Sequence, residues 1–524
     1  MSHHHEITRS AGLIGMLTLL SRIAGMVRDM VISSFFGAGM VADAFVVAFS
    51  IPNTFRQLVG EGSMVGSFVP VFTEYLHQRS KQEALRLAQI AFTFLTLFLL
   101  VITLVGILLS KYVIFILAPG FRDIPGKTEL AALFTQEMFP FLFFIGLVAL
   151  ATGVLNSFSH FSAPAFAPVL FNLATICLVP LFAHRFRQPG LVLAIAVLVG
   201  GFLQLLLQLP VLWKHGLRLR PDFNFSHPAL VRIGRLMLPS ILGIAVYQLN
   251  VLIATVFVSP FPGGRTFVYY ADRLIQFPLG IFAISVGTAI LPTLSRLAAK
   301  QDFPALSDAF AFGLRLVAFV IFPAAVGLAL LRVPIVEMIF ERHEFTHADT
   351  LNTAKALLFF ALGLPVFSGL RVVVPAYYSL QDTRTPMRAA ALAMLSNVIG
   401  CWLLTKVLAH AGVSLSIALA GYINLSILLL VLRRRLNLTF PRTFALALGR
   451  SALACVPVAV VAELFARLPL WHQPGAVTVK LLDLGAAIAI CIALYLLVAW
   501  LLKSQELTAF ADILRRRLAG SRPA

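Results

Sequence analysis

The sequence predicts an all-α polytopic membrane protein with about 14 transmembrane helices. Its 524 residues are 59% hydrophobic and only 12% charged, whereas charged residues make up about 25% of a typical soluble domain. Apolar stretches recur along nearly the whole length, and most reach the ~20 residues that a spanning helix needs. Ten-residue segments of alternating polarity, the pattern of transmembrane β-strands, are absent from the sequence.

Fourteen apolar stretches are separated by short charged or Gly/Pro-rich connections. They cover residues 10–35, 41–66, 87–117, 131–156, 164–183, 189–213, 236–259, 267–295, 309–331, 355–379, 387–408, 413–432, 447–466 and 481–502. An even number of spans places both termini on the same side of the membrane. Lys and Arg are enriched in cytoplasmic loops, and with a cytoplasmic N-terminus the inside connections carry about twice as many of them as the outside ones. We therefore expect both termini in the cytoplasm. Arg185 and Arg187 run against this rule, because they lie in a connection that this topology places outside.

The same enrichment accounts for the net charge of +19, so we expect no nucleic-acid partner. The four cysteines lie in apolar runs without paired spacing and predict neither disulfides nor a zinc site. There is no phosphate-binding G-x-x-x-x-G-K-[ST] loop, no H-E-x-x-H, no G-x-S-x-G and no Cys/His cluster. The sequence therefore predicts a transporter rather than an enzyme, with no metal site and no cofactor. Its energy would come from an ion gradient, the membrane potential or the gradient of the cargo.

A weak repeat with an offset of about 225 residues indicates two related halves. The matching residues are Asp43 and Pro52 against Asp272 and Pro278, and Asn172 against Asn397. Repeated halves are common in transporters. We predict an N-terminal lobe of six helices (1–220), a C-terminal lobe of six helices (221–440) and two extra helices (441–505). The tail (506–524) has apolar residues at helical spacing and ends in basic ones, which predicts a cytoplasmic amphipathic helix or a plain basic tail.

Six arginines lie inside otherwise apolar stretches: Arg22, Arg28, Arg56, Arg273, Arg315 and Arg371. A cation at mid-bilayer costs at least ~2.5–3.5 kcal/mol, so such residues usually face a cavity or a partner. The first three share their stretches with Asp29, Asp43 and Glu61, and the second stretch is interrupted by Pro52, Gly60 and Gly62. Broken helices are where transporters expose backbone groups to a central cavity.

We interpret this region as a net-positive cavity lined by Arg22, Arg28 and Arg56, with the three acids restraining the guanidinium groups. Arginine suits a phosphate because its planar fork binds two oxygens at once and stays charged. The alternative is a set of buried ion pairs that tie helices together, which the equal numbers of arginines and acids permit. The coincidence of clustered charge with a broken helix favours the cavity.

The other three arginines are assigned individually. Asp272 and Arg273 are adjacent on a helix and point to different faces, and we expect Arg273 to face the cavity. Arg371 lies deep in its stretch and is either a cavity charge or a structural or snorkelling residue. Arg315 lies near the end of its stretch and is expected to be a snorkelling anchor.

Particular residues also carry a family resemblance. They are Ser21–Gly25, Arg28-Asp29, Phe36–Gly39, Ala42–Phe45, Ile51–Asn53, Arg56 and Glu61-Gly62, followed later by Tyr270–Arg273, Gln276–Pro278, Tyr378, Gln381-Asp382 and Thr385-Pro386. Together with the fourteen stretches they resemble the MurJ (MviN) family of the MOP exporter superfamily. These proteins are the lipid II flippases of bacterial peptidoglycan synthesis.

The resemblance implies two six-helix lobes around a central cavity, with the last two helices forming a groove for a polyprenyl tail. The cargo would be lipid II, an undecaprenyl-pyrophosphate carrying a disaccharide-pentapeptide. Alternating access would move it from the cytoplasmic to the periplasmic leaflet of the bacterial inner membrane. Family positions that contact or gate the head group correspond to Arg22, Arg28, Arg56 and Arg273, to the polar Ser21 and Asn53, to the charged partners Asp43, Glu61 and Asp272, and less strongly to Arg371.

The resemblance also implies partners. Besides lipid II and membrane lipids, these would be cell wall synthesis or division proteins, and a monomer is expected. Some family members use sodium or the membrane potential, and no residue set in this chain decides between the two. Substituting Arg28 with Ala is expected to stop transport without unfolding the protein.

Two alternatives remain. One is a flippase for another polyprenyl-pyrophosphate-linked saccharide, because recognition of the pyrophosphate would look the same. A transporter of a cationic drug would need a net-acidic cavity and is disfavoured. The other alternative is a non-transporting membrane scaffold of wall synthesis, which would tolerate neutralisation of the intramembrane arginines.

Overall fold

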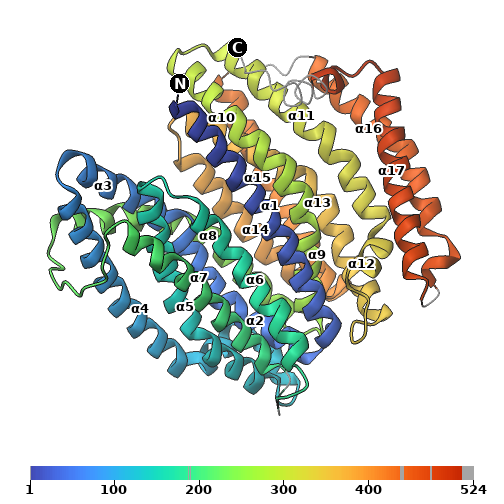
Figure 1. The fold of residues 1–524 in the computed structure, drawn as a ribbon. Helices are drawn as coiled ribbons and strands as arrows, with labels where there is room; N and C mark the ends of the chain where they lie inside the picture. Colours follow the sequence, from blue (N-terminus) through green and yellow to red (C-terminus); the bar gives the residue numbers. More distant parts are fainter. Residues whose placement is uncertain (1, 187, 189, 437–441, 473–474, 510–524) are drawn as a thin grey trace. The chain divides into compact units, whose positions relative to one another are not determined.

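The computed structural model describes residues 2–186, 188, 190–436, 442–472 and 475–509 (Figure 1). Within these residues all regular secondary structure is helical, with no strand. In the described part of the chain, eleven helices are long and apolar enough to cross a membrane. All fourteen stretches that the sequence predicts as spans fall on helices, while the count of fourteen spans itself stays a prediction. The other three predicted stretches lie on α1, on α2 with its continuation, and on α8.

The chain folds into two compact units, each of which is described by itself. The first comprises residues up to Thr266 together with Arg342–Phe345, and the second comprises Phe267–Glu341 and the residues from Thr346 onward. The elements of the first are α1 (Ser2–Phe36), α2 (Met40–Phe55), η1 (Arg56–Met64), α3 (Val65–Gln78), α4 (Lys81–Leu117), η2 (Pro119–Asp123), α5 (Lys127–Ser157), α6 (Ser162–Phe182), α7 (Leu191–Lys214) and α8 (Pro228–Val258).

The second unit contains the remaining elements. They are α9 (Gly264–Pro278), whose first residues belong to the first unit, η3 (Leu279–Ala283), α10 (Ile284–Ala299), α11 (Phe303–Leu330), α12 (Arg332–Phe340), α13 (His347–Ser379), α14 (Arg384–Leu408), α15 (His410–Leu436), α16 (Arg442–Ala466), η4 (Pro469–His472) and α17 (Val477–Leu501).

Helix α8 belongs to the first unit, although the predicted division at residue 220 assigns it to the second lobe. Two polar contacts hold it there. Arg232 Nη1 lies 2.8 Å from Glu74 Oε2 on α3, and the Gln248 side chain donates to Gln57 in η1. Both contacts join residues far apart in the sequence, and no local pattern reveals them.

A π-helical segment follows a proline-containing helix in each unit. In the first, α2 passes through Pro52 and continues as η1. In the second, α9 ends at Pro278 and continues as η3. A π-helical turn keeps backbone groups hydrogen-bonded while it shifts the direction of later side chains, and such turns are frequent at functional sites. The interruption that the sequence predicts near Pro52 is therefore a change of helix type rather than an unwound segment.

The last two helices, α16 and α17, lie side by side and pack on α11 (Figure 1). Their shared core is built from Phe319, Leu331, Ala454, Cys455, Val458, Ala462, Trp471, Leu484, Ala487, Cys491, Tyr495 and Ala499. The hydroxyl of Tyr495 donates to the carbonyl of Phe319 at 2.6 Å, so the pair is fixed by a buried hydrogen bond as well as by apolar contact.

The predicted tail begins at residue 506, and residues 510–524 lie outside the described part of the chain. Glu506 is buried, and its Oε1 lies 3.7 Å from Arg315 Nε on α11. Arg315 therefore has an acidic partner within the protein, whereas the sequence predicts a snorkelling anchor. The two residues are 191 positions apart, so neither local pattern could indicate the contact.

Gly287 allows α10 and α13 to approach closely, because a Cβ at this position would lie 2.2 Å from the carbonyl oxygen of Arg371. We expect Gly287→Ala to destabilise the protein by ~1–3 kcal/mol through overpacking. The matched control is Gly327→Ala on α11, where a Cβ would meet nothing within 4 Å and the change should stabilise by ~0.4–1 kcal/mol. Thermal unfolding of the purified variants measures both, and equal effects of the two substitutions would contradict the close packing.

Candidate functional site

The guanidinium group of Arg28 is the centre of a buried polar cluster between α1 and α6. Its Nε and Nη2 donate to Asp29 Oδ1 at 3.0 and 2.7 Å, and its Nη1 donates to Asn172 Oδ1 at 3.2 Å. Arg28 is 7% exposed and Asp29 2%. Hydrogen bonds between ionised groups are stronger than neutral ones, so the cluster fixes the guanidinium in one orientation.

Asn172 also connects the cluster to an earlier turn of α1. Its Nδ2 donates to the carbonyl of Ser21 at 3.1 Å, and a Cβ on Gly25 would lie 3.6 Å from the same nitrogen. The amide therefore bridges the backbone at Ser21 to the side chain of Arg28, two turns further along the same helix. Ser21 contributes through its backbone carbonyl here.

Arg22 lies on α1 beside this cluster and is half-buried. None of the residues that the structure describes forms a hydrogen bond or ion pair with its side chain. The acid that the sequence places on the same face, Asp29, is bound to Arg28 instead. Arg22 is therefore a cation within an apolar helix whose charge no described acid balances.

Arg56 stands at the start of the π-helical segment η1. Its Nε donates to Asn53 Oδ1 at 3.1 Å, and both residues are half-buried. The backbone of Glu61 lies in the same segment, but its side chain is outside the described part of the structure. The turn that follows Pro52 thus presents an amide and a guanidinium together.

Asp43 is completely buried and has a different cation as partner. Its Oδ2 accepts from Lys127 Nζ at 2.7 Å and from the N–H of Gly263 at 2.9 Å. Its Oδ1 accepts from the N–H and the hydroxyl of Thr266 at 2.9 and 2.7 Å. The expectation that Asp43 restrains an arginine therefore does not describe this geometry, because four donors from other segments occupy its oxygens.

In the second unit, Asp272 and Arg273 are half-buried on α9. Arg273 Nη2 donates to the hydroxyl of Tyr269, one turn earlier, at 2.8 Å, and its guanidinium carbon lies 4.9 Å from the centre of the same ring. Arg371 on α13 has an exposed side chain and no ion pair with any described residue. These residues belong to a different unit from Arg22, Arg28 and Arg56.

The later family motif lies at the turn between α13 and α14. Asp382 accepts from the N–H and the hydroxyl of Thr385 at 3.0 and 2.8 Å and from Arg435 at 2.6 Å. The hydrogen bonds from Thr385 and the charge of Arg435 hold the pKa of Asp382 below its usual value. A cavity of about 530 Å³ adjoins this turn. Its lining consists of Ser295, Ala298, Ala299, Gln301, Phe303, Tyr378, Ser379, Leu380, Gln381 and Arg435.

The first unit therefore contains two kinds of charged residue, buried ion pairs and half-buried arginines. The pairs Arg28–Asp29 and Asp43–Lys127 are buried, and specific donors and acceptors surround them. Arg22 and Arg56 are only half-buried. Such groups can bind an anion with several oxygens, because a guanidinium fork contacts two of them at once.

Sequence reasoning missed two residues of this arrangement, Asn172 as the acceptor for Arg28 and Lys127 as the partner of Asp43. The repeat did single out Asn172, by its match with Asn397, but gave it no contact. Lys127 lies in a connection next to an apolar stretch and carries no signal of its own.

The family model and the curated relatives indicate one family. The family model described as "Lipid II flippase MurJ" matches residues 32–510. A probable lipid II flippase MurJ of Vibrio cholerae is 37% identical over 81% of this chain and 82% of its own length. The lipid II flippase MurJ of Burkholderia cenocepacia is 35% identical over 80% and 82%. A probable lipid II flippase MurJ of Rhizobium tropici is 33% identical over 98% and 96%.

Solved structures agree. One described as lipid II flippase MurJ in an inward closed conformation matches with a TM-score of 0.77 and 25% identity, over 97% of this chain and 99% of that one. An inward-facing multidrug resistance MATE transporter of the MOP superfamily matches with a TM-score of 0.67 at 15% identity, over 82% and 98%. The second match shows a shared fold only.

The buried pair Asp43–Lys127 yields a stability prediction. Asp43→Asn leaves the Lys127 ammonium buried without a counter-charge, which should cost ~3–5 kcal/mol. The double variant Asp43→Asn/Lys127→Met removes both charges and should recover part of that loss. Thermal unfolding of the purified proteins measures the difference, and a double variant less stable than Asp43→Asn would contradict the assignment.

Proposed function

The chain belongs to the MurJ family of lipid II flippases, and from this premise we propose that it carries lipid II from the cytoplasmic to the periplasmic leaflet by alternating access. It would do so in the bacterial inner membrane, as a step of cell wall synthesis. The eleven apolar helices and the family agree with a multi-pass protein of this membrane. The transporter fold supports transport rather than catalysis.

The observation that carries the head-group assignment is Arg22, a half-buried cation on an apolar helix without an acidic partner among the described residues. Holding such a charge in a membrane protein is costly, and an anionic ligand would offset that cost. The pyrophosphate of lipid II offers several oxygens to planar guanidinium groups. In this proposal Arg22 and Arg56 contact the pyrophosphate directly, with Asn53 positioning Arg56.

Arg28 has a different role in this proposal. Because it is buried and bound by Asp29 and Asn172, it fixes α1 against α6. Arg28→Ala would leave the buried Asp29 without this donor, so loss of transport in that variant could reflect misfolding. Arg22→Ala breaks no ion pair with a described acid and is the sharper test.

Movement is proposed to arise at η1. Transport requires that the cargo bind one conformation more tightly than another. A change between π-helical and α-helical register in this segment would rotate Arg56 by roughly 100° about the helix axis for each residue of shift. Glu61 lies in the same segment and would be displaced with it.

In the second unit, we assign Arg273, with Asp272 as charged partner, and Arg371 to further contacts with the head group. Helices α16 and α17 expose many large apolar side chains, including Leu453, Val460 and Leu481, and are proposed to hold the polyprenyl tail. Both termini would be cytoplasmic and the protein a monomer. Sodium or the membrane potential would supply energy, and wall synthesis or division proteins would be partners.

Binding of lipid II to the purified protein tests the head-group assignment. Arg22→Ala should weaken binding by ~10–100-fold, because a hydrogen bond to a charged group contributes about 1.5–3 kcal/mol. The matched control is Arg235→Ala, which removes an exposed arginine of α8 and should leave affinity unchanged. Transport of lipid II in reconstituted vesicles should likewise fall for Arg22→Ala and stay unchanged for Arg235→Ala.

The triple variant Arg22/Arg28/Arg56→Ala, if folded, separates the alternatives. Its control is Arg218/Arg220/Arg235→Ala, which removes the same charge from exposed positions. If the triple variant and the wild type bind and transport lipid II equally, these arginines have a structural role only, and the scaffold alternative is favoured. Equal affinity of the wild type for lipid II and for undecaprenyl pyrophosphate with a different saccharide would favour a flippase of broader specificity.

A further inference from the structure

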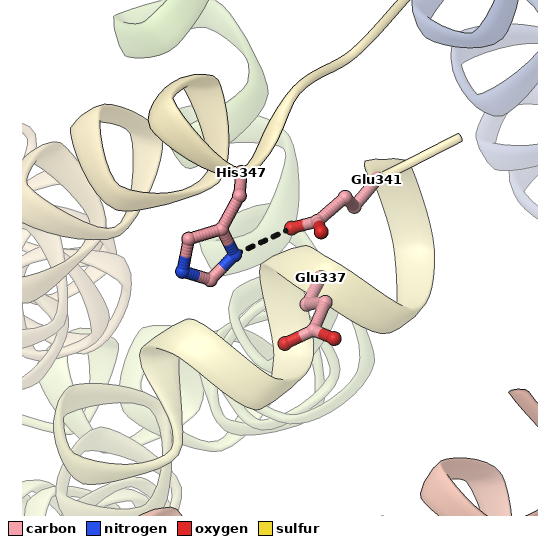
Figure 2. A group of neighbouring side chains, drawn as sticks. All are labelled: Glu337, Glu341 and His347. Carbon is pink, nitrogen blue, oxygen red and sulfur yellow. Dashed lines mark hydrogen bonds and ion pairs between the residues drawn. The ribbon is translucent and has the colours of Figure 1, made fainter. Parts of the chain in front are cut away.

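Three side chains able to bind a metal ion meet where α12 ends and α13 begins. They are Glu337 on α12, Glu341 at its C-terminal cap and His347 at the first position of α13 (Figure 2). One ligand atom from each lies within 4.8 Å of the other two. This cluster takes no part in the proposed head-group site.

The contacts of Glu341 show that the cluster is ordered around its carboxylate. His347 Nδ1 lies 3.1 Å from Glu341 Oε2, and the hydroxyl of Thr350 donates to the same oxygen at 2.6 Å. Figure 2 shows the Nδ1 of the imidazole turned toward the carboxylate of Glu341. Thr350 is fully buried, so Glu341 is held in place from behind by a side chain that cannot itself bind a cation strongly.

Glu337 supplies an independent observation that points to a ligand. It is 6% exposed, and its Oε1 accepts from Lys480. Its Oε2 is buried and accepts no hydrogen bond from any residue that the structure describes. A buried carboxylate oxygen without a donor is costly, and here it belongs to a carboxylate with a ligand atom within 4.8 Å of Glu341 and His347.

We propose that Glu337, Glu341 and His347 form a binding site for a divalent transition-metal ion such as Zn²⁺. Carboxylate and neutral imidazole are its usual oxygen and nitrogen ligands, and three protein ligands plus a water complete a common coordination shell. In a tetrahedral site with bonds of ~2.0–2.2 Å, ligand atoms lie about 3.4 Å apart. Displacement of these side chains by about an ångström would therefore bring them to bonding distance.

A purely structural ion-pair network explains less of the geometry. Lys480 can balance one carboxylate, but it contacts Oε1 of Glu337 and leaves Oε2 without a donor among the described residues. It also leaves two carboxylates and an imidazole within 4.8 Å of one another. A cation between them would take the place of the proton that joins His347 to Glu341.

The site has a mechanical consequence within the second unit. Glu337 and Glu341 are one helical turn apart on α12, and His347 begins α13, so a bound ion would tie the end of one helix to the start of the next. The sequence alone predicts no metal because the three ligands, Glu337, Glu341 and His347, include no cysteine and only one histidine. The capping box formed by Thr346 and Asp349 orients His347, and this is visible only in the fold.

Binding of Zn²⁺, with Co²⁺ as its spectroscopic substitute, tests the proposal on the full chain. His3, His4 and His5 are first replaced by serine, because they could bind metal themselves. In this background, we expect one saturable Zn²⁺ site by calorimetry and a visible Co²⁺ absorption band that Zn²⁺ abolishes. His347→Asn and Glu341→Gln should each weaken binding at least about tenfold, the smallest effect expected when even an outer-shell partner is lost.

The matched control is His343→Asn, an exposed histidine between the two helices with a positive φ of 47°, a conformation that asparagine tolerates. It should leave binding unchanged. Absence of a saturable site in the background protein would overturn the proposal without any further variant. So would equal affinity in the folded double variant Glu341→Gln/His347→Asn, because the ion would then be bound elsewhere.

Discussion

The hydrogen-bonded carboxylate of Asp43 is the interaction on which the first unit depends. It joins α2 to the start of α5 through Lys127, to the turn before α9 through Gly263, and to the first turn of α9 through Thr266. A carboxylate that is 0% exposed is tolerable only when paired and hydrogen-bonded. Because both of its oxygens are occupied, Asp43 fixes three segments at one point and leaves the arginines of α1 to other partners.

This arrangement gives the arginines unequal roles. Arg28 is enclosed by Asp29 and Asn172, whereas Arg22 is half-buried on the same helix, six residues earlier. Two arginines that look equivalent in the sequence are thus a structural charge and an available one. Neither interpretation that the sequence leaves open, a binding cavity or a set of ion pairs, describes the whole cluster.

The sequence predicts the helices well because hydrophobicity and length decide them, and each predicted stretch falls on a helix. It also locates the irregular turn after Pro52, although not its π-helical form. It could not supply the contacts of Asp43 with Lys127, of Arg315 with Glu506 or of Arg28 with Asn172, because these join residues 84 or more positions apart and depend on packing. The cluster of two glutamates and a histidine between α12 and α13 was missed for a related reason, since the turn between the two helices brings its members together.

The contacts of Asp43 also constrain how the protein is made. The carboxylate leaves the ribosome 84 residues before Lys127 and 220 residues before Gly263. At ordinary translation rates these intervals last roughly 4–17 s and 11–44 s. Throughout that time the nascent α2 carries an acid whose final partners have not yet been synthesised or placed. During biogenesis this segment therefore has to stay in contact with water or with other protein until the later helices are inserted. The order of synthesis thus becomes part of the folding problem.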